Sequence, residues 1–204
     1  MKGKTIRAIV AGLGLPNETR WTTDEHNRIL VKDEPWDWEI EERPDLLPVS
    51  STFNGKMYMA SLDVFTSGGA GLSSRYFVEA DDRLLDLQSV DDMRFFLERY
   101  AVLEDPVMLA DLLKRCQGQG RMANVYREDG RLESSLDDSS RSAVKEMGLM
   151  DPVMVGDELA FDAWRVVMAG NDEAIEVEHW TLSMKGPDGP EWHRTPLAGL
   201  LRFE

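Results

Sequence analysis

Residues 57–87 read "MYMASLDVFTSGGAGLSSRYFVEADDRLLDL" and carry the clearest secondary-structure pattern of the chain. Side chains of residues 57–65 alternate with a period of two, which is typical of a strand with one mostly buried side. The stretches 75–79 and 83–87 predict two further strands, joined by a tight turn at residues 80–82. Three strands joined by short connections predict an antiparallel meander. The buried face of the first strand is formed by Tyr58, Ala60, Leu62 and Val64.

The segment "TSGGAGLSS" at residues 66–74 raises the question of a phosphate-binding loop. Such a loop of the strand–loop–helix type needs a helix N-terminus directed at the anion, and usually a lysine at a fixed spacing. This segment has no lysine and leads into another strand. We therefore interpret it as a wide hairpin connection in which the glycines supply positive φ angles. A flexible loop that contacts a ligand is the alternative.

Two helices are expected in the middle of the chain. Ser89 is a suitable N-cap for a helix that extends to Tyr100, and Asp105 followed by Pro106 begins a second helix that ends at Gly118. Cys116 falls in the apolar stripe of the second helix, which favours a structural cysteine over a catalytic thiol. Shorter helices are predicted before Pro16 and between Thr23 and Leu30.

The C-terminal half predicts a second antiparallel unit. Residues 128–130 are typical of a hairpin turn, and a short helix is expected to end at Gly148. The predicted fold class is α+β, with an antiparallel β-sheet (the meander plus a C-terminal hairpin unit) and a central helix pair. We divide the chain into residues 1–48, with short helices and an acidic arm, and residues 49–204 as a single α+β domain. Strands and a closing segment are expected within 159–170, 174–184 and 191–201.

Residues 33–48, "DEPWDWEIEERPDLLP", predict the arm, because three prolines and many acids surround two tryptophans. The tryptophans are expected to pack either on the main domain or on a partner. Because tryptophan is enriched in interface anchors, the candidate binding residues are Trp36, Trp38, Glu41 and Glu42. The part from Trp36 onward is similar to a segment of tail tube and adaptor proteins of short-tailed phages. No residue role is transferred from that similarity, and the sequence as a whole identifies no family.

Composition restricts the partners. The formal net charge is −15 over 204 residues, and no basic cluster offers a face for phosphates, which argues against nucleic acid. The acidity favours a basic protein partner or simply solubility. No apolar run reaches the length of a membrane span, and Arg7 interrupts the apolar N-terminal stretch, so neither a membrane protein nor a signal peptide is expected. A single cysteine is consistent with the cytoplasm.

The sequence predicts no catalytic residue, metal site or cofactor. The chain has three histidines, without a His-Glu-x-x-His spacing, and it has no Gly-x-Ser-x-Gly motif. The best remaining constellation is Glu176, Glu178, His179 and His193. Strand alternation directs the two glutamates to one face and His179 to the other. Whether His179 and His193 lie on the same face depends on the pairing register of their two strands. A shift of that register by one residue moves one histidine to the other face, and the sequence does not determine the register.

These observations lead to three candidate functions. The first is a non-catalytic interaction module, such as an acidic immunity or inhibitor protein that binds a basic partner. The second is a structural subunit of a larger assembly, for example a phage-like one, that grips its neighbours with residues 33–48. The third is a small hydrolase whose site is assembled from dispersed glutamates and histidines.

Overall fold

The computed structural model shows an α+β fold with antiparallel sheets, as predicted. The chain separates into two compact units, Met1–Phe96 (the N-terminal unit) and Leu97–Glu204 (the C-terminal unit). This division lies well after the boundary at residue 48 expected from composition, because strands on both sides of that point pair with each other. The structure describes residues 3–33, 36–47, 49, 53–66, 69–101, 105–118, 124–125, 136–170, 172–197 and 199–202.

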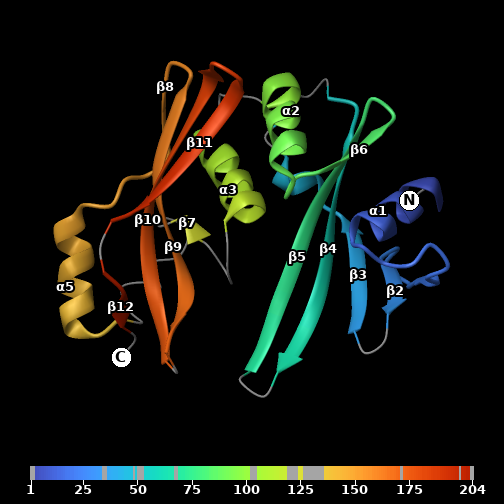
Figure 1. The fold of residues 1–204 in the computed structure, drawn as a ribbon, viewed down its shortest axis with the longest axis horizontal. Coiled ribbons are helices and arrows are strands. Elements are labelled where there is room, and N and C mark those ends of the chain that lie inside the picture. The colour runs from blue at the N-terminus through green and yellow to red at the C-terminus, as the bar shows by residue number, and fades with distance from the viewer. Residues whose placement is uncertain are drawn as a thin grey trace. The chain divides into compact units, whose positions relative to one another are not determined.

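The N-terminal unit contains one antiparallel sheet in which every strand pairs with the next along the chain (Figure 1). The predicted meander of residues 57–87 is confirmed and forms one half of this sheet. The residues 36–42 of the expected arm form an internal strand, and a short 3-10 helix follows at Pro44–Leu46. The strands are β1 (Trp21–Thr23), β2 (Ile29–Asp33), β3 (Trp36–Glu42), β4 (Lys56–Thr66), β5 (Gly69–Ala80) and β6 (Arg83–Asp86).

The helix predicted between Thr23 and Leu30 is wrong, since these residues form the β1–β2 hairpin. The Asp24 carboxylate accepts hydrogen bonds from the backbone N–H groups of His26 and Arg28, both at 2.9 Å. Asn27 adopts a positive φ of 61°. A short acidic side chain that bonds its own following backbone favours a turn over a helix, which explains the difference.

The glycine-rich segment reverses the chain, as predicted, but it is not a wide loop. Residues 69–74 belong to β5 and pair in register with residues 61–66 of β4, up to Thr66 opposite Gly69. The two residues at the tip, 67 and 68, lie outside the described residues. The hairpin therefore continues through the segment, since small residues pair across strands without steric conflict.

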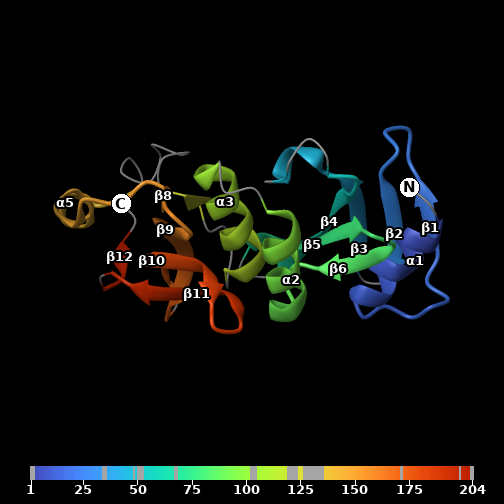
Figure 2. The same ribbon diagram turned by 90° about the horizontal axis from the view of Figure 1, so that it is seen from above.

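Helix α1 (Gly3–Gly12) confirms the predicted N-terminal helix and packs on one face of the sheet (Figures 1 and 2). Alternation brings one apolar side chain after another to that face from four successive strands. The core that they form with Ile6, Ile9 and Val10 of α1 consists of Ile29, Val31, Ile40, Tyr58, Ala60 and Phe77.

The predicted central helix pair is confirmed as α2 (Val90–Tyr100) and α3 (Pro106–Gln117). The Asp105 carboxylate accepts the backbone N–H of Met108 at 2.9 Å, and Pro106 occupies the first helical turn. These local signals are the ones that the sequence displays. Among the helices that the structure describes, none combines the length and the hydropathy needed to cross a bilayer.

The C-terminal unit is built on the long antiparallel pair β9 (Glu158–Ala169) and β10 (Asp172–Gly186). Strand β11 (Gly189–Pro196) pairs with β10, and the short strands β7 (Asn124–Val125), β8 (Val153–Val155) and β12 (Leu201–Arg202) complete the sheet. Most of the predicted hairpin around residues 128–130 lies outside the described residues.

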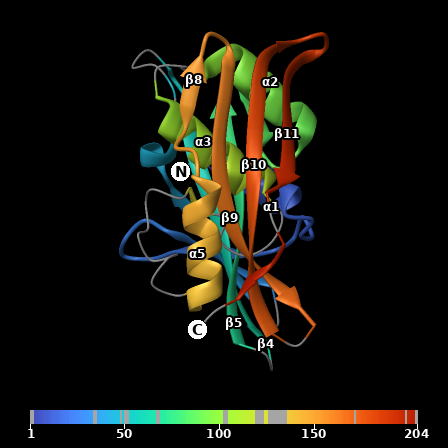
Figure 3. The ribbon, with the colours of Figure 1, turned by 90° about the vertical axis from the view of Figure 1, so that its left-hand side faces the viewer.

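Helix α5 (Asp138–Met147) confirms the short helix predicted before Gly148. It lies along β9 on one face of the C-terminal sheet (Figure 3), and its Val144 shares a buried cluster with Trp164, Ile175 and Val177. The helix ends at Gly148, whose positive φ of 60° is the left-handed conformation that a glycine adopts without strain.

Candidate functional site

The four candidate residues of the expected arm lie on β3, and the structure does not bring them together on one surface. Trp38 is half-buried and packs against the α1 core, with Val31 and Leu62 as its cross-strand partners. The side chain of Trp36 lies outside the described part of the structure. Glu41 and Glu42 are adjacent in a strand, so their side chains point to opposite faces of the sheet.

Both glutamates have cationic neighbours within the chain. The carboxylate of Glu42 lies 2.6 Å from the Lys56 ammonium, and Glu41 lies 3.2 Å from the guanidinium of Arg43. On the same strand, Glu39 pairs with Arg28 at 2.6 Å. The acidic run is therefore partly neutralised, by Arg43 within the same segment and by Arg28 and Lys56, which strand pairing brings beside it.

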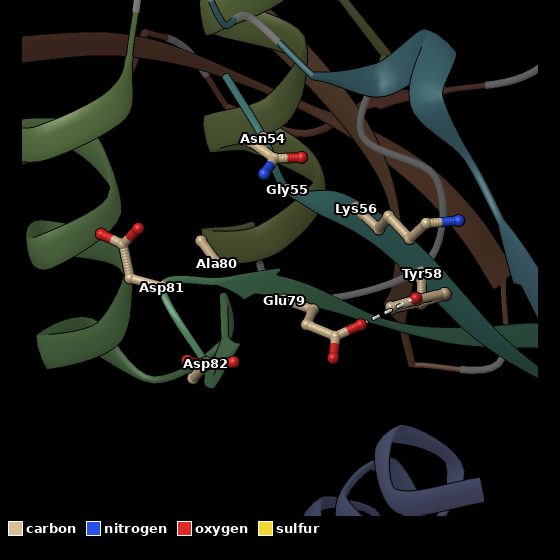
Figure 4. A pocket seen from close by; sticks show the side chains of 8 residues that line it. All are labelled: Asn54, Gly55, Lys56, Tyr58, Glu79, Ala80, Asp81 and Asp82. Atoms are coloured by element: carbon tan, nitrogen blue, oxygen red, sulfur yellow. Dashed lines mark hydrogen bonds between the residues drawn. The ribbon is translucent and has the colours of Figure 1, made fainter. Parts of the chain in front are cut away.

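A second region contains a pocket that sequence patterns did not indicate. Residues 54–56 and Tyr58 at the start of β4, with residues 79–82 at the end of β5, line a cavity of about 520 Å³, here called the Glu79 pocket (Figure 4). A Cβ atom on Gly55 would lie 2.2 Å from the Phe53 ring and 2.7 Å from the Glu79 carbonyl oxygen. Only glycine fits at this wall, because no real Cβ approaches other atoms so closely.

The carboxylate of Glu79 is half-buried and is held by two hydroxyl groups. The Thr5 hydroxyl donates to Oε1 at 2.9 Å, and the Tyr58 hydroxyl donates to Oε2 at 3.1 Å. Burial is the main cause that raises the pKa of Tyr58 above its ordinary value, and the hydrogen bond to Glu79 adds to it. In the part of the chain that the structure describes, no lysine or arginine lies within ion-pair distance of Glu79.

The other charged residues of the pocket do not neutralise Glu79. Lys56 is engaged with Glu42, and Figure 4 shows its side chain directed away from Glu79. Asp81 and Asp82 form the β5–β6 turn with positive φ angles of 48° and 59°, and both are exposed. Figure 4 shows their carboxylates directed away from Glu79. The charged residues that line the pocket are therefore three carboxylates and one lysine, and Glu79 is the carboxylate that two hydroxyl groups orient.

The residues of the C-terminal constellation divide between the two faces of the sheet, as alternation predicts. His193 is the cross-strand partner of Thr181, so it lies on the same face as His179. The structure thereby fixes the strand register, which the sequence left open. On the opposite face, Glu176 accepts a hydrogen bond from Arg165 at 2.8 Å, and the buried Glu178 lies 3.4 Å from the same guanidinium. The four residues do not converge.

His179 has one ordered partner, which the sequence did not indicate. Its Nδ1 lies 2.7 Å from Oδ1 of Asp162, a side chain that is only 5% exposed. The other oxygen of Asp162 accepts the backbone N–H of Met150 at 2.6 Å. This carboxylate orients the imidazole through Nδ1, and the His179 side chain is partly exposed. The exposed His193 lies 3.6 Å from a carboxylate oxygen of Glu191.

Two further groups bear on catalysis. Cys116 is buried on α3, where a structural cysteine is expected. Lys114 is also buried on α3, with its ammonium 2.9 Å from a carboxylate oxygen of Asp111. Among the described residues, no group of three or more histidine, cysteine, aspartate or glutamate side chains is arranged to hold a metal ion.

No protein-family model, curated protein or solved structure matches this chain.

Proposed function

We propose that the protein is a non-catalytic interaction module of the cytoplasm, an acidic immunity- or inhibitor-type protein that binds a basic protein. The observation that carries the proposal is the Glu79 pocket, in which a half-buried, oriented carboxylate has no cationic partner among the described residues. Such a carboxylate favours a cation supplied by another molecule.

The charge of the chain supports the same partner class. With a formal net charge of −15, the chain attracts a basic protein over distances up to a Debye length. This attraction accelerates association at low salt. The chain has a single cysteine, which is buried and cannot form a disulfide within the chain, and this supports a reducing compartment.

The test is capture of partners from a lysate of the source organism by the tagged full-length protein, at low and at high salt. Each basic protein retained at low salt is then purified, and its Kd for the protein is measured over a salt series. We expect a direct complex whose affinity falls as salt rises. A partner bound with salt-independent affinity, or the absence of any direct basic partner, would contradict the proposal.

The alternative of a structural subunit receives less support from the position of residues 36–42. Strand β3 is paired with β2 on one side and with β4 on the other, so this part of the segment has no free edge with which to grip a neighbour. Deletion of residues 33–48 would remove β3 from between β2 and β4 and so disrupt the sheet. Loss of an assembly after this deletion would therefore not show that the segment contacts a neighbouring subunit.

The alternative of a hydrolase is supported by one observation, the 2.7 Å contact between Asp162 and His179. A histidine oriented by a buried carboxylate has the arrangement of a general base. The test is a screen of ester and amide substrates with the wild type and His179→Ala. An activity that His179→Ala abolishes while the fold is retained would favour the hydrolase over the interaction module.

A further inference from the structure

We infer that the Glu79 pocket is a socket for a guanidinium group, supplied by an arginine side chain of the partner. This inference rests on the proposed function, because it names the chemical group by which a basic partner is recognised. It is argued from the hydrogen bonds of Glu79, the neighbouring charges and the size of the cavity.

The carboxylate has capacity left for a bidentate donor. A carboxylate offers about four lone-pair sites. In the described structure Glu79 uses one on each oxygen, for the hydroxyls of Thr5 and Tyr58. Since both hydroxyls are neutral, the negative charge is oriented without being compensated. The planar fork of a guanidinium donates two parallel N–H bonds to such a carboxylate.

The neighbouring charges favour a cation from outside the chain. Lys56 is the cross-strand partner of Glu79, but its ammonium lies 2.6 Å from Glu42, and Figure 4 shows its side chain directed away from Glu79. The exposed Asp82 adds a negative charge to the lining of the pocket, and Figure 4 shows its carboxylate directed away from Glu79. It therefore attracts a cation toward the pocket, where Glu79 is the carboxylate that two hydroxyl groups orient.

The dimensions and the chemistry of the walls suit an arginine. A volume of about 520 Å³ lies within the range of small-ligand sites. Tyr58, whose hydroxyl donates to Glu79, also lines the cavity, and its ring offers apolar surface to the methylene stem of such a side chain. A guanidinium is more weakly hydrated than an ammonium and loses less on entering a half-buried site, so arginine is expected to bind more tightly than lysine.

The experiment uses the full chain and a small probe, N-acetyl-arginine methylamide. Nuclear magnetic resonance titration should shift the backbone amides of Gly55 and Ala80. The citrulline analogue has nearly the same shape without the charge and should not shift them. Glu79→Gln should weaken arginine binding about 10-fold or more, as expected for the loss of charge-assisted hydrogen bonds. Glu146→Gln removes the same charge from an exposed position of α5 and should leave binding unchanged.

If Glu79→Gln does not fold, Tyr58→Phe serves instead, because it removes only the hydroxyl that holds Oε2. We expect this variant to bind the arginine probe a few-fold more weakly than the wild type. Equal shifts with arginine and citrulline, no shift at Gly55 and Ala80, or full binding by the folded Glu79→Gln variant would each overturn the inference.

The outcomes separate this inference from the proposed function. If the arginine probe binds and no direct basic partner is found, the Glu79 pocket is a guanidinium site and the proposed interaction with a basic protein is wrong. If a basic partner binds the wild type and Glu79→Gln equally well, the module stands and the socket is wrong.

Discussion

Replacement of Asp162 by alanine tests whether this buried carboxylate organises the C-terminal sheet. The side chain is 5% exposed and joins three segments, because it accepts the Met150 backbone N–H at 2.6 Å and contacts Nδ1 of His179 at 2.7 Å. Asp162→Ala removes both contacts and leaves the N–H of Met150 without its acceptor.

The expected loss follows from the two contacts. A hydrogen bond to an ionised group contributes about 1.5–3 kcal/mol, and removal of the carboxylate also relieves the cost of burying its charge. Because His179 is half-exposed, water replaces part of its lost contact. We therefore expect Asp162→Ala to lower the stability of the β9–β10 region by about 2–4 kcal/mol. Asp162→Asn keeps an acceptor oxygen for Met150 and should cost about 1–2 kcal/mol.

Hydrogen exchange followed by mass spectrometry resolves this effect by region in the intact chain. A loss of 2–4 kcal/mol corresponds to roughly 30- to 1000-fold faster exchange of the protected amides of β9 and β10. The amides of β4 and β5, in the other unit, should be unaffected. Asp188→Ala, at the exposed turn before β11, is the matched control and should change neither region.

A double-mutant cycle with His179→Ala isolates the contact between the two side chains. We expect a coupling of about 1–2 kcal/mol between Asp162 and His179. Unchanged exchange in β9 and β10 of Asp162→Ala would refute the reasoning. It would mean that desolvation of the carboxylate cancels both of its contacts.

Three further predictions concern single side chains. Because its pKa is raised above the ordinary value of 10.0, Tyr58 stabilises the fold fully below that pH and progressively less above it. Tyr58→Phe should therefore lack one tyrosinate absorbance step above pH 10 that the wild type shows, and an unchanged titration would contradict this. Asp82→Gly relieves a positive φ of 59° and should stabilise the protein by about 0.5–1 kcal/mol in thermal unfolding, whereas a lower Tm would contradict the assigned turn. Asp105→Ala removes the N-cap of α3 and should lower the free energy of unfolding in urea by about 1 kcal/mol. No loss would show that Pro106 is sufficient to begin the helix without this cap.

Local signals predicted the elements whose determinants lie within a few residues. Helix α3 begins at Asp105–Pro106 because a side-chain acceptor and a preset φ act on the adjoining turn. Strands β4, β5 and β6 follow from side-chain alternation and a two-residue turn. The same local logic fails at Asp24, whose carboxylate bonds to the following backbone and favours a hairpin where Thr23 and the two acids after it indicated the start of a helix.

The candidate binding residues show where local reasoning ends. Prolines and acids describe residues 33–48 as an extended arm, and the backbone of residues 36–42 is indeed extended. An extended segment pairs in a sheet only where other strands can form backbone hydrogen bonds with it. Both β2 and β4 pair with residues 36–42 in this way. Trp38 then packs against the α1 core because its face of β3 is the one that α1 covers.

The amino-acid sequence by itself determined the helix caps, the two-residue period of the strands and the acidity of the chain. It also determined that Glu176 and His179 lie on opposite faces of one strand. These properties depend on neighbouring residues or on simple counts. The tertiary structure decided the rest. Thr5 lies 74 residues from Glu79 in sequence and Tyr58 lies 21 residues from it, yet both hydroxyls meet its carboxylate. The register of β10 against β9 likewise selected Asp162 as the partner of His179. Contacts of this kind form only after the sheets have set their register, because no local preference acts over such distances.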